Sequence, residues 1–120
     1  MPRAFAVLVK VVPDLDQLRF DPERKTVVRE GNQLYANPFD QRALRVALDL
    51  RRPGETVSVL SMGPPAAESV LREALALGAD RAVLITDRAL AGSDTLVTAR
   101  VLAHALRRVD HRVVLAGSWT

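Results

Sequence analysis

Four short apolar runs alternate with amphipathic stretches along the chain. The runs cover residues 5–12, 56–61, 82–86 and 112–116 and are rich in Val, Leu and Ile, as strands covered on both faces usually are. Strands that alternate with helices are typical of a parallel sheet built from β-α-β units. The pattern therefore predicts a three-layer α/β fold with helices on both faces of a four-stranded parallel sheet, whose strands take the order 3-2-1-4.

Three helices are expected between these runs. The first spans residues 37–50, because Asn37 is a good N-cap and Pro38 fits the first helical position. The second follows residues 63–65 and ends at Gly78, a typical C-cap residue. Helical spacing predicts buried stripes made of Ala43, Val46, Ala47 and Leu50 in the first helix and of Ala66, Val70, Ala74 and Leu77 in the second.

The third helix is expected to start near Ser93 and to end near Arg108. The segment 93–95, Ser-Asp-Thr, is a group of N-cap candidates. The apolar positions that follow at helical spacing are Leu96, Val97, Val101, Leu102, Ala105 and Leu106.

The segment between the first run and the first helix interrupts this alternation. Charged and apolar residues mix in residues 18–21 and 26–29, and residues 21–24 between them read as a turn. We therefore expect a hairpin between Leu18 and Val28. It is an insertion beyond the end of the first strand, where loops commonly carry function.

Composition limits the class of protein. The 120 residues, 48% of them hydrophobic, suit a single domain over residues 1–120. The 17 basic residues are scattered, the net charge is only +3 and aromatic residues make up 4%, which argues against a nucleic-acid partner. The absence of cysteine is compatible with a cytoplasmic protein. The N-terminal apolar run is too short to span a membrane.

No catalytic constellation is visible in the sequence. Ser61, Ser93 and Ser118 lack a plausible histidine base and an oxyanion-hole signature. His104 and His111 have no clustered carboxylates or cysteines beside them, so a metal site is not expected. Gly-x-Gly-x-x-Gly and Walker motifs are also missing. We therefore expect a protein that is not an enzyme.

Several segments together resemble the beta subunit of electron transfer flavoprotein. They are KVVPD at residues 10–14, NPFD at 37–40, LSMGP at 60–64 and ALALGADR at 74–81, extended by SDT at 93–95 and ARVL at 99–102. Their order and spacing match the family as well. The resemblance covers essentially the whole chain.

The resemblance implies an adenine-nucleotide-binding, alpha-hydrolase-like α/β fold and a role in electron transfer. A beta subunit of this family pairs with an alpha subunit that holds FAD, and the heterodimer carries electrons from dehydrogenases toward the respiratory chain. The beta subunit also buries an AMP that is structural. Such a subunit needs no catalytic residues of its own.

The resemblance also implies which residues bind the cofactor. Leu8, the turn 37–40, Met62 and Gly117 match positions that surround AMP in the family. With their chain neighbours, the candidate cofactor-binding residues are Leu8, Val9, Lys10, Asn37, Pro38, Phe39, Asp40, Met62, Gly63, Gly117 and Ser118.

Sheet topology predicts the same place for a ligand. Ligands of open parallel sheets lie beyond the carboxyl ends of the strands, where the strand order reverses. That crevice would lie between residues 8–13 and 117–120, with Gly117 allowing close approach of a ligand and the helix start at Asn37 on its rim. The charge of Asp40 argues against direct phosphate contact at this helix start.

Members of the family continue beyond the length of this chain. The polar loop that holds the phosphate in the family is reduced here to residues 118–120. We therefore expect weak or absent AMP binding and no FAD on the isolated chain. Two other functions remain open, a stand-alone adenine-nucleotide-binding module and a domain with an interaction role only. We also expect the open edge of the fourth strand to be covered by a homo-oligomer or by an alpha-type partner.

Overall fold

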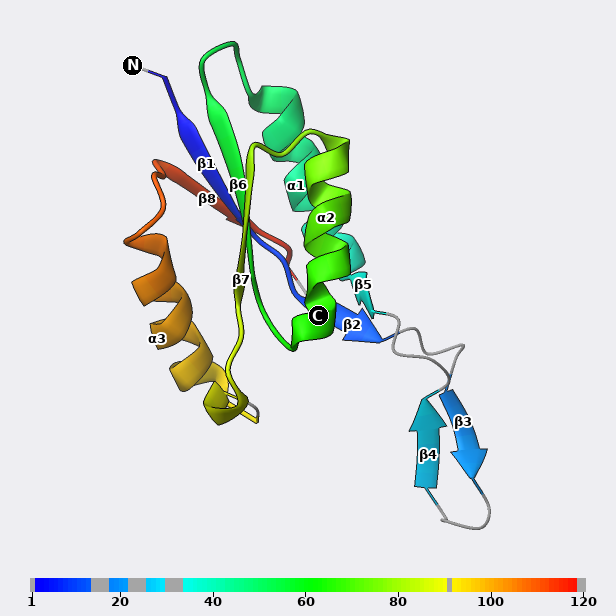
Figure 1. The fold of residues 1–120 in the computed structure, drawn as a ribbon. Helices are drawn as coiled ribbons and strands as arrows, with labels where there is room; N and C mark the ends of the chain where they lie inside the picture. The colour runs from blue at the N-terminus through cyan, green and yellow to red at the C-terminus, as the bar shows by residue number, and fades with distance from the viewer. Residues whose placement is uncertain (1, 14–17, 22–25, 30–33, 91, 119–120) are drawn as a thin grey trace.

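A sheet of four parallel strands forms the centre of the protein (Figure 1). The computed structural model describes residues 2–13, 18–21, 26–29, 34–90 and 92–118. The sheet consists of β1 (Ala4–Leu8), β6 (Thr56–Met62), β7 (Arg81–Ile85) and β8 (Val113–Ala116). Their order, β7-β6-β1-β8, is the predicted 3-2-1-4, so the expected fold class and topology are confirmed.

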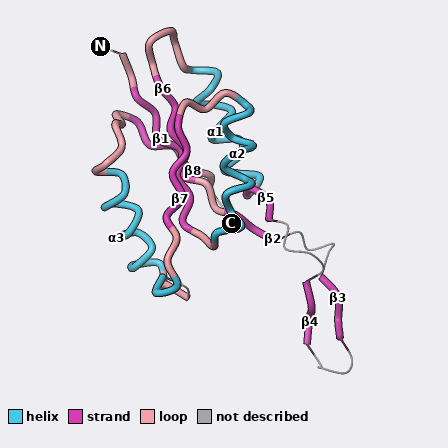
Figure 2. Tube along the Cα trace, in the orientation of Figure 1, coloured by secondary structure: helices cyan, strands magenta, loops and turns pink. Residues whose placement is uncertain are grey.

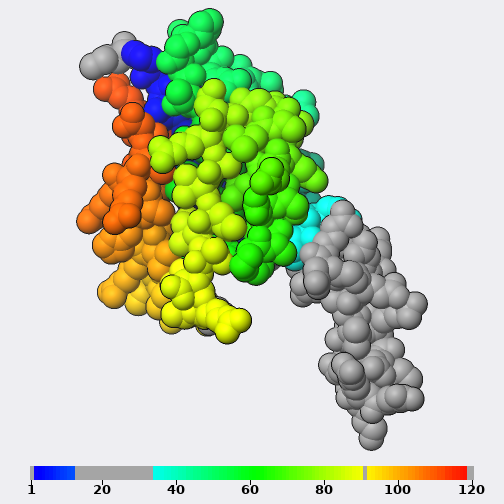
Figure 3. Space-filling view, viewed as in Figure 1, coloured from blue at the N-terminus to red at the C-terminus, as the bar shows by residue number. Residues whose placement is uncertain are grey.

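Helices cover both faces of this sheet (Figures 1 and 2). The helices α1 (Pro38–Leu50) and α2 (Glu68–Leu77) lie on one face, and α3 (Thr95–Leu106) lies on the other. Short 3₁₀ turns precede α2 and α3, namely η2 (Pro65–Ala67) and η3 (Arg88–Leu90). Figure 3 shows β7, an edge strand of the sheet, at the surface between α2 and α3. No helix in the described part of the chain is long and apolar enough to cross a membrane.

The predicted helix ends are confirmed by their caps. Asn37 precedes α1 and its side chain accepts a hydrogen bond from the Phe39 N–H. Asp94 caps α3 in the same way, by accepting from the Val97 N–H at 2.8 Å. Gly78 ends α2 at a φ of 123°, a conformation that side-chain-bearing residues rarely adopt.

The first strand is shorter than predicted. The run 5–12 was expected to form one strand, but β1 ends at Leu8 and a separate strand, β2 (Val11–Pro13), pairs antiparallel with β5 (Leu34–Ala36). The break falls at Lys10, whose backbone carbonyl accepts from the Asn37 N–H and whose N–H donates to the Asp40 carboxylate. The chain therefore leaves the main sheet where α1 begins.

The predicted hairpin insertion is confirmed. The strands β3 (Leu18–Asp21) and β4 (Thr26–Arg29) pair antiparallel, with Leu18 opposite Arg29 and Asp21 opposite Thr26. The turn predicted at residues 21–24 lies mostly outside the described residues.

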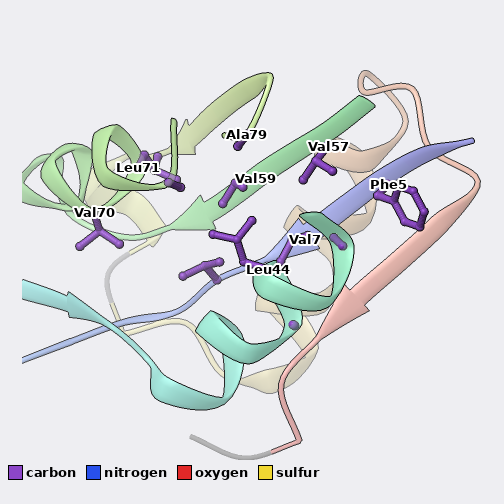
Figure 4. Close-up of a cluster of buried hydrophobic side chains, with 12 residues drawn as sticks. Phe5, Val7, Leu44, Val57, Val59, Val70, Leu71 and Ala79 are labelled. Atoms are coloured by element: carbon purple, nitrogen blue, oxygen red, sulfur yellow. The ribbon is translucent and has the colours of Figure 1, made fainter. Parts of the chain in front are cut away.

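The larger core fills the space between the sheet and the pair α1 and α2 (Figure 4). It consists of alternate side chains of β1 and β6 packed against the two helices, among them Phe5, Val7, Leu44, Val57, Val59, Val70 and Leu71. A smaller cluster of Ala6, Leu60 and Val109 lies on the α3 face. The sheet is therefore apolar on both faces, as its uninterrupted Val, Leu and Ile runs predict.

The predicted helix stripes are only partly correct. Val46 and Leu50 of α1 are 46% and 48% exposed, because the buried face of α1 is centred on Ala43 and Ala47 and includes Leu44 instead. Leu77 of α2 is 64% exposed. Ala66 is exposed because it lies in the 3₁₀ turn, whose tighter winding brings Ala67 inward. In α3 no residue is fully buried, and the predicted positions 96 and 97 are exposed.

Candidate functional site

The strand order reverses between β1 and β8. The chain passes from β1 to β6 and β7 on one side, then crosses behind the sheet through α3 and returns to the other side of β1. β1 and β8 run parallel, with Leu8 opposite Ala116 at their carboxyl ends. A reversal of this kind is where α/β sheets bind ligands.

The start of α1 reaches this position. The Asn37 N–H donates to the Lys10 carbonyl at 2.8 Å, and Asn37 is 3% exposed. Pro38 occupies the first helical position and is exposed to solvent. The structure therefore brings the segment 37–40 to the carboxyl end of β1, as both the topology and the family resemblance predict.

Asp40 joins the two strands. One carboxylate oxygen accepts the Lys10 N–H at 2.8 Å, and the other accepts the Gly117 N–H at 2.7 Å. The side chain is 5% exposed and lies in the first turn of α1, where the helix dipole favours a negative charge. The Asp40 carboxylate thus spans the gap between β1 and β8 beyond their last paired residues.

Gly117 leaves room for the protein backbone, whereas the sequence suggested that it leaves room for a ligand. A Cβ at this position would lie 2.6 Å from the Phe39 carbonyl carbon and 2.7 Å from the Asp40 nitrogen. Real Cβ atoms do not come so close to backbone, so only glycine fits. In this structure it is the first turn of α1 that approaches the Gly117 backbone.

The expected crevice is also narrower than the sequence suggested. Val11 and the residues after it turn away to pair with β5, so only residues 8–10 remain beside β8 and Gly117. Val9 is buried in the larger core, and its side chain is not available to a ligand. Gly63 lies beside β2, where a Cβ would be 3.2 Å from the Val11 side chain.

The opposite face of the same sheet edge is apolar and partly open. Leu8 is half-buried and packs beside the cluster of Ala6 and Leu60 on the α3 face. Met62, two residues after Leu60 in β6, is half-buried, and Ala116, opposite Leu8, is exposed. Leu8, Met62 and Ala116 are here called the apolar floor. Ala116 was not among the predicted site residues, although its position before a glycine at a strand end is the kind of signal that marks such sites.

The exposed candidates lie around this edge. Lys10 and Ser118 are exposed, and Phe39 is 39% exposed with the Arg42 guanidinium 6.0 Å from its ring centre. Ser61 is 1% exposed, and its hydroxyl has no hydrogen-bond partner in the described part of the chain. The sequence indicated the burial of this hydroxyl only through the position of Ser61 in the apolar run 56–61.

The ion pairs with shifted pKa values lie at the other end of the strands. Arg3, before β1, bonds Glu55, before β6, at 3.0 Å, and this bond lowers the pKa of Glu55 to about 2. The Val57 N–H and the Arg51 side chain bond Asp80 and lower the pKa of that carboxyl group. These pairs hold loops at the amino ends of the strands, away from the reversal. Among the described residues no group of three or more His, Cys, Asp or Glu could hold a metal ion.

Comparison with known proteins gives a consistent family. The model of the electron transfer flavoprotein domain matches residues 25–120. The electron transfer flavoprotein subunit beta of Thermoanaerobacterium thermosaccharolyticum is 49% identical over 112 residues, which are 92% of this chain and 43% of the relative. The protein FixA of Bradyrhizobium diazoefficiens is 53% identical over 86% of this chain and 36% of the relative.

A third relative is named as part of a larger complex. The caffeyl-CoA reductase-Etf complex subunit CarD of Acetobacterium woodii is 45% identical over 92% of this chain and 44% of the relative. The chain therefore spans less than half the length of each of these relatives.

Proposed function

Because this chain belongs to the electron transfer flavoprotein family, we propose that it forms the N-terminal, nucleotide-binding part of a beta-type subunit. In this function it binds AMP beyond the carboxyl ends of β1, β6 and β8. It pairs with an alpha-type subunit that holds FAD, and the pair acts in the cytoplasm as an electron carrier between dehydrogenases and the respiratory chain. The chain itself is not an enzyme.

The apolar floor at the strand reversal is the observation that carries this proposal. Leu8, Met62 and Ala116 come from three neighbouring strands, and each is at least partly open at the carboxyl edge. An adenine ring is flat and largely apolar on its faces, so it can cover such a floor while its edge bonds backbone groups at the strand ends. The polar face of the same edge is occupied by Asp40, whose oxygens already accept two N–H groups.

The described residues offer fewer partners for the phosphate of AMP than for its adenine ring. The Lys10 side chain is exposed at the same edge and supplies a cation, but the Asp40 carboxylate beside it repels an anion. Each charge-assisted bond to a phosphate is worth about 1.5–3 kcal/mol, so a phosphate that meets few cations or N–H donors among the described residues adds little to the affinity for AMP. We therefore expect AMP and adenosine to bind this chain weakly and with similar affinity.

Titration followed by NMR tests the proposed nucleotide site. AMP, adenosine and inorganic phosphate are added separately to the purified chain, and amide shifts are followed by residue. We expect saturable shifts at Leu8, Met62 and Gly117 with AMP and adenosine, with dissociation constants on the order of a millimolar. Phosphate alone should shift few of these amides.

Two variants with the same change in volume make the test specific. Ala116→Leu fills the apolar floor and should weaken adenosine binding about tenfold or more. Ala99→Leu adds the same atoms to an exposed position of α3 and should leave binding unchanged. The helices α1 and α2 also line a groove, which includes Leu44, Leu48 and Val70. Shifts confined to that groove, or binding that Ala116→Leu does not weaken, would contradict the proposed site.

Co-expression tests the proposed partner. The alpha subunit from the Thermoanaerobacterium thermosaccharolyticum relative is a suitable probe, because its beta subunit shares 49% identity with this chain over 112 residues. We expect a complex that contains flavin, whereas this chain purified alone should contain none. Flavin retained by the chain alone would contradict the assignment of FAD to the partner.

A further inference from the structure

A groove lies between β7 and α3, which Figure 3 shows side by side at the surface. It belongs to the edge of the sheet away from β8, because β6 and β1 separate β7 from β8. Its volume is about 710 Å³, which falls within the range of roughly 300–1,000 Å³ that is usual for small-molecule sites. The groove is therefore large enough for a ligand and is separate from the strand reversal.

The walls of the groove are apolar along most of its length. Val83 and Ile85 of β7 pack with the smaller core cluster on the α3 face. Val101 and Ala105 of α3 are four residues apart, so they lie on one side of the helix, and both line the groove. All four side chains are only half-buried. A ligand in the groove would complete the burial of these apolar walls.

Three arginines gather at one end of the groove. α3 connects the carboxyl end of β7 to the amino end of β8, so it runs antiparallel to β7. Arg81 at the start of β7 therefore lies at the same end as Arg107 and Arg108, which follow α3. In the described part of the chain none of the three is paired with a carboxylate, and Asp80 beside them already bonds Arg51.

We propose that this groove binds a carboxylate amphiphile with an unbranched chain of about ten carbons. The carboxylate lies among the three arginines, because guanidinium groups bond carboxylates in pairs of parallel hydrogen bonds. The chain lies along Val83, Ile85 and Val101. From Arg81 to Ile85 the strand rises about 13 Å. An extended carbon chain with bonds of about 1.5 Å and angles near 111° advances about 1.25 Å per carbon, so about ten carbons fill this length.

The distribution of charge favours one anionic head group over an acidic helix of a partner protein. Such a helix would present carboxylates along its length, about one turn or 5.4 Å apart. The half of the groove around Ile85 and Val101 has no cation among its lining residues to meet them. His104, one turn before Arg108, is the lining residue nearest to the three arginines on α3. One charged end and one apolar end match the head and the tail of a single molecule.

Titration followed by NMR tests the groove. Decanoate, butyrate and decyltrimethylammonium are added separately to the purified chain, below the concentrations at which they form micelles. We expect saturable shifts with decanoate at the amides of Val83, Ala105 and Arg108, with a dissociation constant on the order of a millimolar. Butyrate and decyltrimethylammonium should bind at least about tenfold more weakly, because the first lacks the chain and the second the negative charge.

The length of the chain gives a second reading. A fully buried methylene strengthens binding about fourfold, and this groove covers about one side of the chain. Each carbon added between butyrate and decanoate should therefore strengthen binding by about twofold. Dodecanoate should bind no more tightly than decanoate, because its last carbons extend past the groove.

Two pairs of variants locate the head and the tail. Arg108→Glu should weaken decanoate binding about tenfold or more, whereas Arg100→Glu makes the same charge change on an exposed part of α3 outside the groove and should have little effect. Val101→Glu places a carboxylate beside the tail and should weaken binding by a similar factor. Ala103→Glu is its matched control, since Ala103 is exposed and does not line the groove. Circular dichroism checks that each variant is folded.

Several outcomes would overturn the proposal. Decanoate that gives no saturable shifts, or that binds only as micelles, would exclude a site for single molecules, and the second result would indicate a lipid surface. Equal binding of decyltrimethylammonium would indicate an apolar surface without charge recognition, and equal binding of butyrate a simple anion site. An acidic amphipathic peptide that binds the groove where decanoate does not would assign it to a protein partner. Arg108→Glu that weakens binding no more than Arg100→Glu would remove the proposed head-group contact.

Discussion

Replacing Asp40 tests whether its carboxylate holds the start of α1 to the sheet. Asp40→Ala removes the acceptors of the Lys10 and Gly117 N–H groups, which now lie 2.8 and 2.7 Å away. Because Asp40 is 5% exposed, water replaces these acceptors poorly. Each orphaned donor should cost about 1–3 kcal/mol, so the loss of both acceptors should lower the free energy of unfolding by about 2–6 kcal/mol. A loss of this size is a large part of the whole free energy of unfolding, which is roughly 5–15 kcal/mol for an ordinary domain.

The amide variant separates hydrogen bonding from packing. Asp40→Asn keeps the shape of the side chain but offers one acceptor oxygen and turns an NH₂ group toward the second N–H donor. Only one of the two bonds can form, and we expect a loss of about 1–3 kcal/mol. Asp49→Asn is the matched control, because Asp49 is exposed on the same helix and its change should stay within about 0.5 kcal/mol.

Urea unfolding followed by circular dichroism measures these differences by linear extrapolation. Amide hydrogen exchange adds a local reading, since Lys10 and Gly117 should lose protection in Asp40→Ala before the core strands do. If the free energy of unfolding of Asp40→Ala lies within about 0.5 kcal/mol of the wild-type value, or if both amides stay protected, the Asp40 carboxylate does not hold α1 to the sheet.

Three further predictions concern single residues. The bond from Arg3 lowers the pKa of Glu55 to about 2 from an ordinary 4.5. The unfolded chain therefore binds more protons than the folded chain between those two pH values, so the free energy of unfolding falls as the pH drops through that window. Glu55→Gln removes this titration, and we expect its urea midpoint to fall less than that of the wild type between about pH 6 and 2. Gly117→Ala should destabilise the protein by about 1–3 kcal/mol or more in the same urea assay, since its Cβ meets the α1 backbone. A urea midpoint equal to that of the wild type would exclude this clash. Ser61→Ala removes a buried hydroxyl without a partner among the described residues and should leave stability unchanged or raise it by about 1 kcal/mol, whereas a clear loss would reveal an unseen partner.

Most of the fold could be predicted because its signals are local. Uninterrupted apolar runs mark strands covered on both faces, and Asn37, Asp94 and Gly78 mark helix ends through their own hydrogen bonds or φ angles. The helix stripes were less predictable because burial depends on neighbours. Val46 and Leu50 have the spacing of core residues, but they are exposed because the buried face of α1 is centred on Ala43 and Ala47.

The site was predictable in position but not in detail. Topology and the family resemblance both indicated the carboxyl ends of β1 and β8, and the segment 37–40 does lie there. The double role of Asp40 could not be read from the sequence, because its two donors are 30 residues before it and 77 after it. The end of β1 at Leu8 lies two residues before Lys10, whose N–H makes one of these long-range contacts. Whether the residues at this edge bind AMP remains a proposal.

The position of β1 in the sheet has a consequence for how the chain folds. β1 is made first, yet it lies in the interior of the sheet, where Phe5 pairs with Val57 on one side and with Val113 on the other. Its second partner is thus among the last residues of the described chain. Closing so long a loop is entropically costly and slow, so β1, β6 and β7 with α1 and α2 should form a first folding unit. β8 and α3 would dock later, and an apolar side of β1 would stay exposed during synthesis until they do.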